Sequence, residues 1–244
     1  MNGSRSMYRN PQVLDRKAHA ELRFQPSSDF SFAADQGSFP ILVNEFPEAA
    51  ASYPLLFVRH EDRAPVPIAS TGLGLDRNEF VDAAGRWQSD AYVPAYVRRY
   101  PFTFTDLGAA RERSGDLVLC IDLDAPQLRE EGVGLFDAPT DSSSVADRAL
   151  EFCNRFQAGY RQTLAFAEHL DTLGLFVERR FKVTYDRAEQ RDRVLQGCSV
   201  IDEERLQALD DDAFLELRRR NYLPAIYAHL RSLHRLVSLA AKLH

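Results

Sequence analysis

The stretch that most constrains the fold covers residues 145–173. Apolar residues recur there at spacings of three and four, the period of a helix with one buried face. They are Leu150, Cys153, Phe156, Tyr160, Leu164, Ala167 and Leu170. Ser143 or Ser144 can cap the start of this helix, and Gly174 can end it, because glycine accepts the left-handed conformation common after helices. The sequence therefore predicts one long helix that packs against a sheet or another helix.

Short strand-like segments on both sides of this helix predict a mainly antiparallel sheet, because short turns join them. Before it we expect strands near residues 39–43, 55–58, 67–73, 80–81, 102–105 and 117–121, with short helices at 45–52 and 94–99. After it we expect a second hairpin at 176–185 and 194–200, helices opening at 202–204 and 211, and a last helix at 223–243. This pattern predicts an α+β fold with a mainly antiparallel sheet, a long middle helix and a C-terminal helical segment.

The sequence predicts an extended N-terminal segment followed by one domain. Residues 1–38 are polar and read as an extended N-terminal segment, with a short strand near residues 21–24. No stretch rich in glycine, serine and proline separates the halves of the remainder. We therefore expect residues 39–244 to form a single α+β domain.

Composition excludes several classes of function. The 244 residues carry 30 Lys and Arg against 36 Asp and Glu, a net charge of −6, which disfavours nucleic-acid binding. No apolar run is long enough to span a membrane, and the first residues lack the apolar core of a secretory signal. Cys120, Cys153 and Cys198 lie far apart and fit buried, reduced thiols. We expect a soluble, cytoplasmic protein.

The central block, residues 80–104, is the candidate binding site. It holds the one tryptophan and several aromatic residues beside two adjacent arginines. The candidate binding residues are Trp87, Tyr92, Tyr96, Arg98 and Arg99. In one interpretation the aromatic residues belong to the core and keep only their polar tips near the surface. In the other, the arginines form a clamp for an anion or a peptide carboxylate. Because neighbours on a helix diverge by about 100°, at most one arginine should point inward.

The common catalytic and cofactor-binding motifs are absent from the sequence. There is no nucleophile elbow, phosphate-binding loop or HExxH motif, so we predict no catalytic residue and no cofactor. Asp122 and Asp124 follow a predicted strand and, with His60, could hold a divalent metal. Solvated loop acids are the favoured interpretation of Asp122 and Asp124, and a polar turn explains His60 equally well. A metal-dependent enzyme is the alternative hypothesis.

Several blocks resemble the SapC family of bacterial proteins. They are NEFPEAAASYPLLFV, FVDAAGRW, YVPAYVRRYPF, LVLCID, EGVGLFD, VIDEERLQAL and IYAHLRSL, spread from about residue 19 to residue 236. The stretch 176–193 departs from the pattern by being longer and more charged.

This resemblance implies a soluble accessory protein in bacteria. The family name implies a link to surface-layer protein secretion, and relatives are sometimes labelled peptide-transporter permeases, although this chain has no membrane span. Relatives also occur with outer-membrane receptor systems, cupin-type oxygenases and flavin-dependent halogenases. The family offers no established catalytic residues to transfer. The preferred hypothesis is a non-catalytic adaptor that binds a protein or peptide, with an oxygenase, a halogenase or a surface-transport component as candidate partner.

Overall fold

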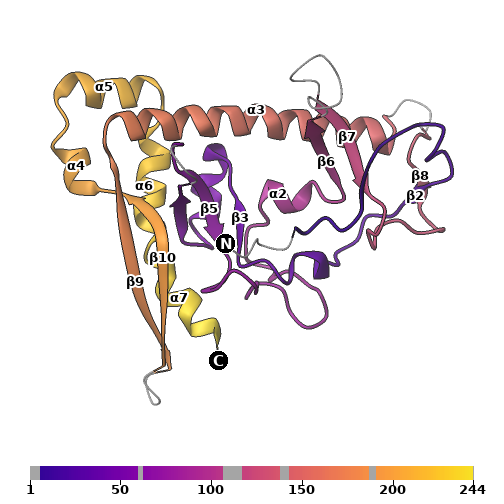
Figure 1. The fold of residues 1–244 in the computed structure, drawn as a ribbon, viewed down its shortest axis with the longest axis horizontal. Coiled ribbons are helices and arrows are strands. Elements are labelled where there is room, and N and C mark those ends of the chain that lie inside the picture. The colour runs from indigo at the N-terminus through magenta and orange to yellow at the C-terminus, as the bar shows by residue number, and fades with distance from the viewer. Residues whose placement is uncertain (1–5, 60–62, 107–116, 138–142, 187–190, 244) are drawn as a thin grey trace.

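The computed structural model describes residues 6–59, 63–106, 117–137, 143–186 and 191–243. Within these residues the strands form antiparallel sheets, and the 28-residue helix α3 (Val145–Thr172) crosses above them (Figure 1). The predicted α+β class and the long middle helix are confirmed.

The helix α3 begins and ends as its sequence predicts. Ser144 Oγ accepts a hydrogen bond from the Asp147 backbone N–H at 3.1 Å, and the Asp147 carboxylate accepts one from the Ser144 N–H at 3.2 Å. Gly174 follows the helix with φ of 65°, in the left-handed region that glycine favours. These contacts satisfy part of the backbone hydrogen-bonding capacity that a helix leaves unpaired at its ends.

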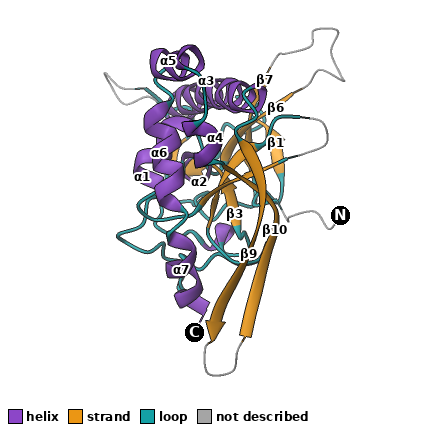
Figure 2. Ribbon diagram, turned by 90° about the vertical axis from the view of Figure 1, so that its left-hand side faces the viewer, coloured by secondary structure: helices purple, strands orange, loops and turns teal. Residues whose placement is uncertain are grey.

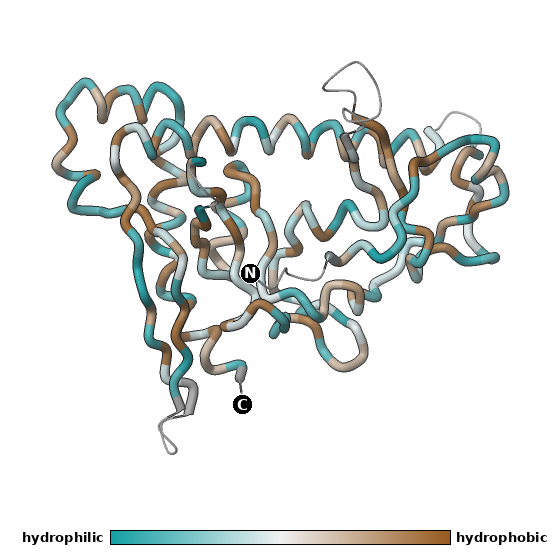
Figure 3. Tube along the Cα trace, in the orientation of Figure 1, coloured by the Kyte–Doolittle hydropathy of each residue, from teal (hydrophilic) through white to brown (hydrophobic). Residues whose placement is uncertain are grey.

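Successive turns of α3 belong to different buried clusters. Its first turns place Ala149 and Cys153 against Phe102 and Ile121, while Phe166 and Leu170 near its other end belong to the main core. Between them, Phe156 packs with Leu42 and Ala95. Figure 3 shows polar and apolar positions alternating along this helix. The helix thus connects otherwise separate parts of the core.

The main sheet has five antiparallel strands. Their order is β3 (Ser38–Pro40), β5 (Val66–Ser70), β4 (Leu55–Val58), β10 (Arg191–Ile201) and β9 (Phe176–Asp186). The predicted hairpin forms from β9 and β10, and it joins the main sheet because Ser199 of β10 pairs with Phe57 of β4. Cys198 and Val200 also pack with Leu56, so burial of apolar side chains accompanies this pairing. The far half of the β9–β10 hairpin extends away from the body (Figures 1 and 2).

A second sheet consists of β1 (Pro11–Val13), β7 (Leu117–Asp122) and β6 (Phe102–Asp106). The strands β2 (Arg23–Phe24) and β8 (Val133–Gly134) pair with each other. The N-terminal segment therefore contributes strands to both. Its residues Met7 and Ala33 are buried in the main core. The division into residues 1–38 and 39–244 stays a prediction.

Shorter helical elements complete the fold. They are η1 (Ser31–Ala33), η2 (Val43–Glu45), α1 (Phe46–Ala49), α2 (Ala95–Arg98), α4 (Glu203–Gln207), α5 (Asp211–Arg219), α6 (Leu223–Ser232), α7 (Arg235–Ala240) and η3 (Ala241–Leu243). Residues 80–81 do not form the expected strand and make only an isolated bridge between Val81 and Trp87.

The predicted last helix is wrong in one respect, because it breaks after Ser232 into α6 and α7. The Ser232 hydroxyl donates to the His229 carbonyl at 2.6 Å, an acceptor that a continuous helix would use for a backbone bond. The same oxygen accepts from the Leu55 N–H of β4 at 2.9 Å. The break between α6 and α7 therefore coincides with a hydrogen bond from strand β4 to the Ser232 side chain.

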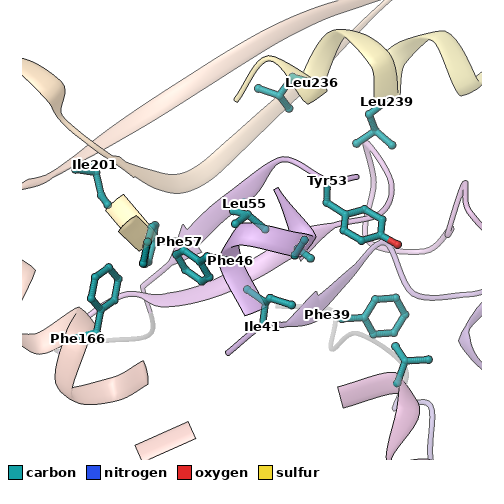
Figure 4. Packing of buried hydrophobic residues seen from close by; sticks show 14 of the residues in the cluster. Phe39, Ile41, Phe46, Tyr53, Leu55, Phe57, Phe166, Ile201, Leu236 and Leu239 are labelled. Atoms are coloured by element: carbon teal, nitrogen blue, oxygen red, sulfur yellow. The ribbon is translucent and has the colours of Figure 1, made fainter. Parts of the chain in front are cut away.

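The main core gathers aromatic rings between α3 and the five-stranded sheet (Figure 4). The ring of Phe46 lies 6.3 Å from that of Phe57 and 6.0 Å from that of Phe166, in edge-to-face contacts. His229 of α6 is fully buried there, and its Nε2 accepts from the Ile201 N–H at 3.0 Å. Burial lowers the pKa of His229 to about 3.

His229 should make stability depend on pH. Its folded pKa lies below the ordinary value of about 6.5, so on acidification the unfolded chain binds a proton before the folded one does. Stability is fully present above about pH 6.5 and falls as the pH drops toward about 3, by at most about 1.4 kcal/mol per pH unit. We expect His229→Gln to flatten this slope in urea unfolding between pH 7 and 4.

The exposed His234 provides the control, and His234→Gln should leave the pH slope unchanged. An identical slope for wild type and His229→Gln would show that this imidazole does not titrate as its burial implies.

Candidate functional site

The candidate site is built on the carboxylate of Glu45, which lies at the end of η2 and is buried. Its Oε1 accepts hydrogen bonds from the Tyr92 hydroxyl and the Ala95 N–H, both at 2.7 Å. Its Oε2 accepts from the Leu42 N–H at 3.0 Å. This one side chain therefore joins η2 to the start of α2. Burial and the neighbouring Glu45 raise the pKa of Tyr92, so its hydroxyl stays a donor.

Arg98 lies at the outer side of this network. Its Nη2 donates to the Tyr92 hydroxyl at 3.0 Å and lies 3.6 Å from Glu45 Oε1. The guanidinium carbon is 5.5 Å from the centre of the Tyr92 ring and 5.9 Å from that of Phe152 on α3. The side chain nevertheless remains 46% exposed. Arg98 is thus held in place by aromatic and polar contacts while presenting charge to solvent.

Arg99 lies deeper, among three aromatic rings. Its guanidinium carbon is 4.3 Å from the Tyr96 ring centre, 4.5 Å from that of Phe156 and 5.8 Å from that of Tyr8. Its Nε is buried and has no hydrogen-bond partner among the described residues. Cation–π contacts offset part of this loss of solvation. Arg99 therefore packs inward, whereas its neighbour Arg98 is the more exposed of the two.

Trp87 lies apart from these residues, in the main core. Its ring centre is 5.6 Å from that of Phe30 and 6.1 Å from that of Phe39. Its Nε1 donates to the Tyr53 hydroxyl at 3.1 Å, and that hydroxyl donates to the Tyr92 carbonyl. The structure brings together Tyr92, Tyr96, Arg98 and Arg99. Trp87 is connected to them through Tyr53 and through the ring of Phe39, which also lies 6.4 Å from that of Tyr96.

A groove of about 440 Å³ is lined by residues of η2, α2 and α3, and we call it the α2 groove. Its lining includes Leu42, Asn44, Glu45, Glu48, Tyr92, Ala95, Arg98, Phe152, Arg155 and Phe156. The sequence argument missed Glu45, Phe152 and Arg155. Phe152 and Phe156 stand one helical turn apart on α3, a spacing that could have indicated a paired aromatic surface. The groove combines aromatic walls with arginines, a composition suited to binding.

The acids proposed for a metal site have other contacts. Asp122 is fully buried, and its carboxylate accepts from the N–H groups of Arg9 at 2.8 Å, Asn10 at 2.9 Å and Asp124 at 3.1 Å. It also accepts from the Tyr100 hydroxyl at 3.2 Å. These four donors occupy most of its acceptor capacity and attach the N-terminal segment to the end of β7.

Of the other two members of that site, the structure describes only Asp124. Asp124 is exposed and accepts from the Asn10 side chain at 3.2 Å, while His60 lies outside the described residues. Among the residues that the structure describes, no group of three or more His, Cys, Asp or Glu side chains could hold a metal ion. The metal-enzyme hypothesis gains no support from this geometry.

The fold and the site together define an α+β protein with an arginine-rimmed aromatic groove. Comparison with family models matches SapC over residues 14–239, nearly the whole chain. The chain therefore belongs to the SapC family, as the sequence blocks predicted. Comparison with curated proteins returned no match, and comparison with solved structures returned none either. In the described part of the chain, no helix combines the length and the hydropathy needed to cross a membrane.

Asp122 should be important for stability rather than for metal binding. We expect Asp122→Asn to lower the free energy of unfolding by about 2–3 kcal/mol, because the amide cannot accept every bond the carboxylate accepts. The exposed Asp124 is the matched control, and Asp124→Asn should change it by less than about 0.5 kcal/mol. Chemical denaturation measures both.

Thermal shift with Mg²⁺, Mn²⁺ or Fe²⁺ tests the opposing hypothesis. A rise in melting temperature that both substitutions abolish would show that the two acids bind metal.

Proposed function

We propose that this SapC-family chain is a non-catalytic accessory protein that binds a protein or peptide partner at the α2 groove. The observation that carries this proposal is the state of Arg98, a side chain fixed by Tyr92, Glu45 and Phe152 yet 46% exposed. A binding group held in one position before the partner arrives loses less conformational entropy when it binds.

The chemistry around Arg98 supports recognition of a carboxylate beside an apolar group. Arginine offers paired donors that match a carboxylate, and the rings of Tyr92 and Phe152 give apolar area next to it. Tyrosine and arginine also contribute much of the binding energy at protein interfaces. Arg99 supports the site from within, because its contacts with Tyr96 and Phe156 hold α2 against α3.

The finer assignments belong to this proposal as well. They are a cytoplasmic location, a partner among oxygenases, halogenases or surface-transport components, and a role linked to surface secretion or outer-membrane uptake. Family membership supports the accessory role, and the groove supports a binding role. In this proposal Trp87 does not contact the partner. It is a core residue that supports Tyr92 through hydrogen bonds by way of Tyr53.

Affinity capture from an extract of the source organism tests the proposal, with the wild-type chain and variants on parallel supports and mass spectrometry as the readout. We expect a protein that is enriched by the wild type and lost with Arg98→Ala. Arg161→Ala is the matched control, since Arg161 is an exposed arginine of α3 that does not line the α2 groove. It should retain the partner.

With a purified partner, Arg98→Ala should weaken binding by about 2 kcal/mol, roughly thirtyfold in Kd, while leaving the melting temperature nearly unchanged. Arg99→Ala should instead lower stability, since it removes contacts with three rings. Isothermal titration calorimetry and thermal unfolding give the two readouts. Binding that is equally tight with wild type and Arg98→Ala would remove the α2 groove as the site.

A further inference from the structure

Acidic and basic residues are segregated along the C-terminal helices. Residues 202–216 contain seven Asp and Glu and one arginine, whereas residues 218–244 contain six Lys and Arg and no acid. The one arginine, Arg205, is already engaged, because it pairs with Asp202 and donates to the Gly174 carbonyl. The helix α4 and the start of α5 therefore carry negative charge, while α6 and α7 carry positive charge.

The exposed side of α6 and α7 presents cations that the protein does not pair. Arg231 and Arg235 are exposed, and their side chains make no hydrogen bond or ion pair with another described residue. Arg235 begins α7, whose first turn holds no acid, although the helix dipole disfavours a cation at this end. On the same helices, Tyr227 is 45% exposed and Val237 is 72% exposed. We call these four residues the basic face, and neither core packing nor the helix dipole accounts for it.

The start of α5 presents the opposite charge. Asp211 and Asp212 are exposed in its first turn, where the helix dipole favours acids. Neither side chain makes an ion pair with another described residue, so both carboxylates face solvent. Leu215 of the same helix is 36% exposed and adds apolar surface. We call these three residues the acidic end.

The basic face and the acidic end are arranged as a two-fold axis requires. The helices α5, α6 and α7 follow one another along one side of the molecule, with α5 at one end and α7 at the other (Figures 1 and 2). A two-fold axis perpendicular to α6, near its middle, exchanges these ends. The acidic end of each copy then meets the basic face of the other, and the contact closes after two copies.

We propose that this chain forms a two-fold dimer in which the acidic end of each copy docks on the basic face of the other. Charge complementarity selects a second copy as the occupant, because one chain carries both halves of the contact in the required order. Burial of Leu215, Tyr227 and Val237 supplies apolar contact, and the charges set register and association rate. The inference is independent of the α2 groove, whose lining includes none of these residues.

Sedimentation velocity of the full chain, over a series of protein concentrations, tests for the dimer. In about 50 mM salt we expect twice the chain mass of 27.7 kDa, and about 500 mM salt should raise the dissociation constant about tenfold or more, because salt screens exposed charges. A wild type that stays monomeric in low salt overturns the proposal. A dimer whose dissociation constant does not respond to salt overturns it as well.

An exchange of charges identifies the two surfaces. Arg231→Glu with Arg235→Glu makes the basic face acidic, and Asp211→Lys with Asp212→Lys makes the acidic end basic. Each double variant alone should be monomeric, because like charges then meet across the axis. An equimolar mixture of the two should recover the dimer, because opposite charges meet at both contacts. Arg161→Glu, on α3 and outside both surfaces, is the control and should dimerise as the wild type does.

The mixture distinguishes the proposed contact from a general effect of charge. If either double variant dimerises alone, or if the mixture of folded variants stays monomeric, the pairing of these two surfaces is overturned. Melting temperatures show that each variant is folded. Should the lysine variant fail to fold, Asp211→Asn with Asp212→Asn replaces it, and an unchanged dissociation constant for that variant overturns the proposal.

Discussion

The carboxylate of Glu45 accepts three hydrogen bonds inside the protein, from a tyrosine hydroxyl and two backbone N–H groups. Burying a carboxylate is expensive unless such donors replace water, so Glu45, Tyr92 and the start of α2 must form together. The position of Arg98 follows from this, because it bonds to the Tyr92 hydroxyl. The α2 groove therefore depends on one buried acid that touches the solvent very little.

A second buried carboxylate holds the other end of the same block. Asp122 accepts from the Tyr100 hydroxyl and from backbone groups of the N-terminal segment, close to where β6 and β7 pair. Between these two acids, Arg99 packs against Tyr96 and Phe156 of the long helix. Residues 92–100 are thus held by a carboxylate near each end and by α3 in the middle, and Arg98 within this stretch remains 46% exposed.

Local patterns predicted elements better than they predicted contacts. The three-to-four spacing and the capping residues fixed the bounds of α3, and Leu55–Val58 was expected as a strand. Periodicity carries no information about partners distant in sequence, so the pairing of Ser199 with Phe57 was missed. The break after Ser232 is accompanied by a hydrogen bond to Leu55, and a helical pattern in the sequence cannot predict such a bond.

For the site, closeness in sequence correctly grouped Tyr92, Tyr96, Arg98 and Arg99. It also included Trp87, which the structure places in the main core. The sequence argument missed Glu45 because a lone acid two residues before a proline resembles an exposed helix start.

Hydrogen–deuterium exchange on Glu45→Gln tests most directly whether this acid organises the site. The amide keeps the shape of the side chain but loses one acceptor, so we predict faster exchange in α2 (Ala95–Arg98), with unchanged exchange in α3 and the five-stranded sheet. Glu48→Gln, an exposed glutamate three residues later, should match the wild type throughout. Unchanged protection of α2 in Glu45→Gln would contradict the account, because the groove would then be held by other contacts.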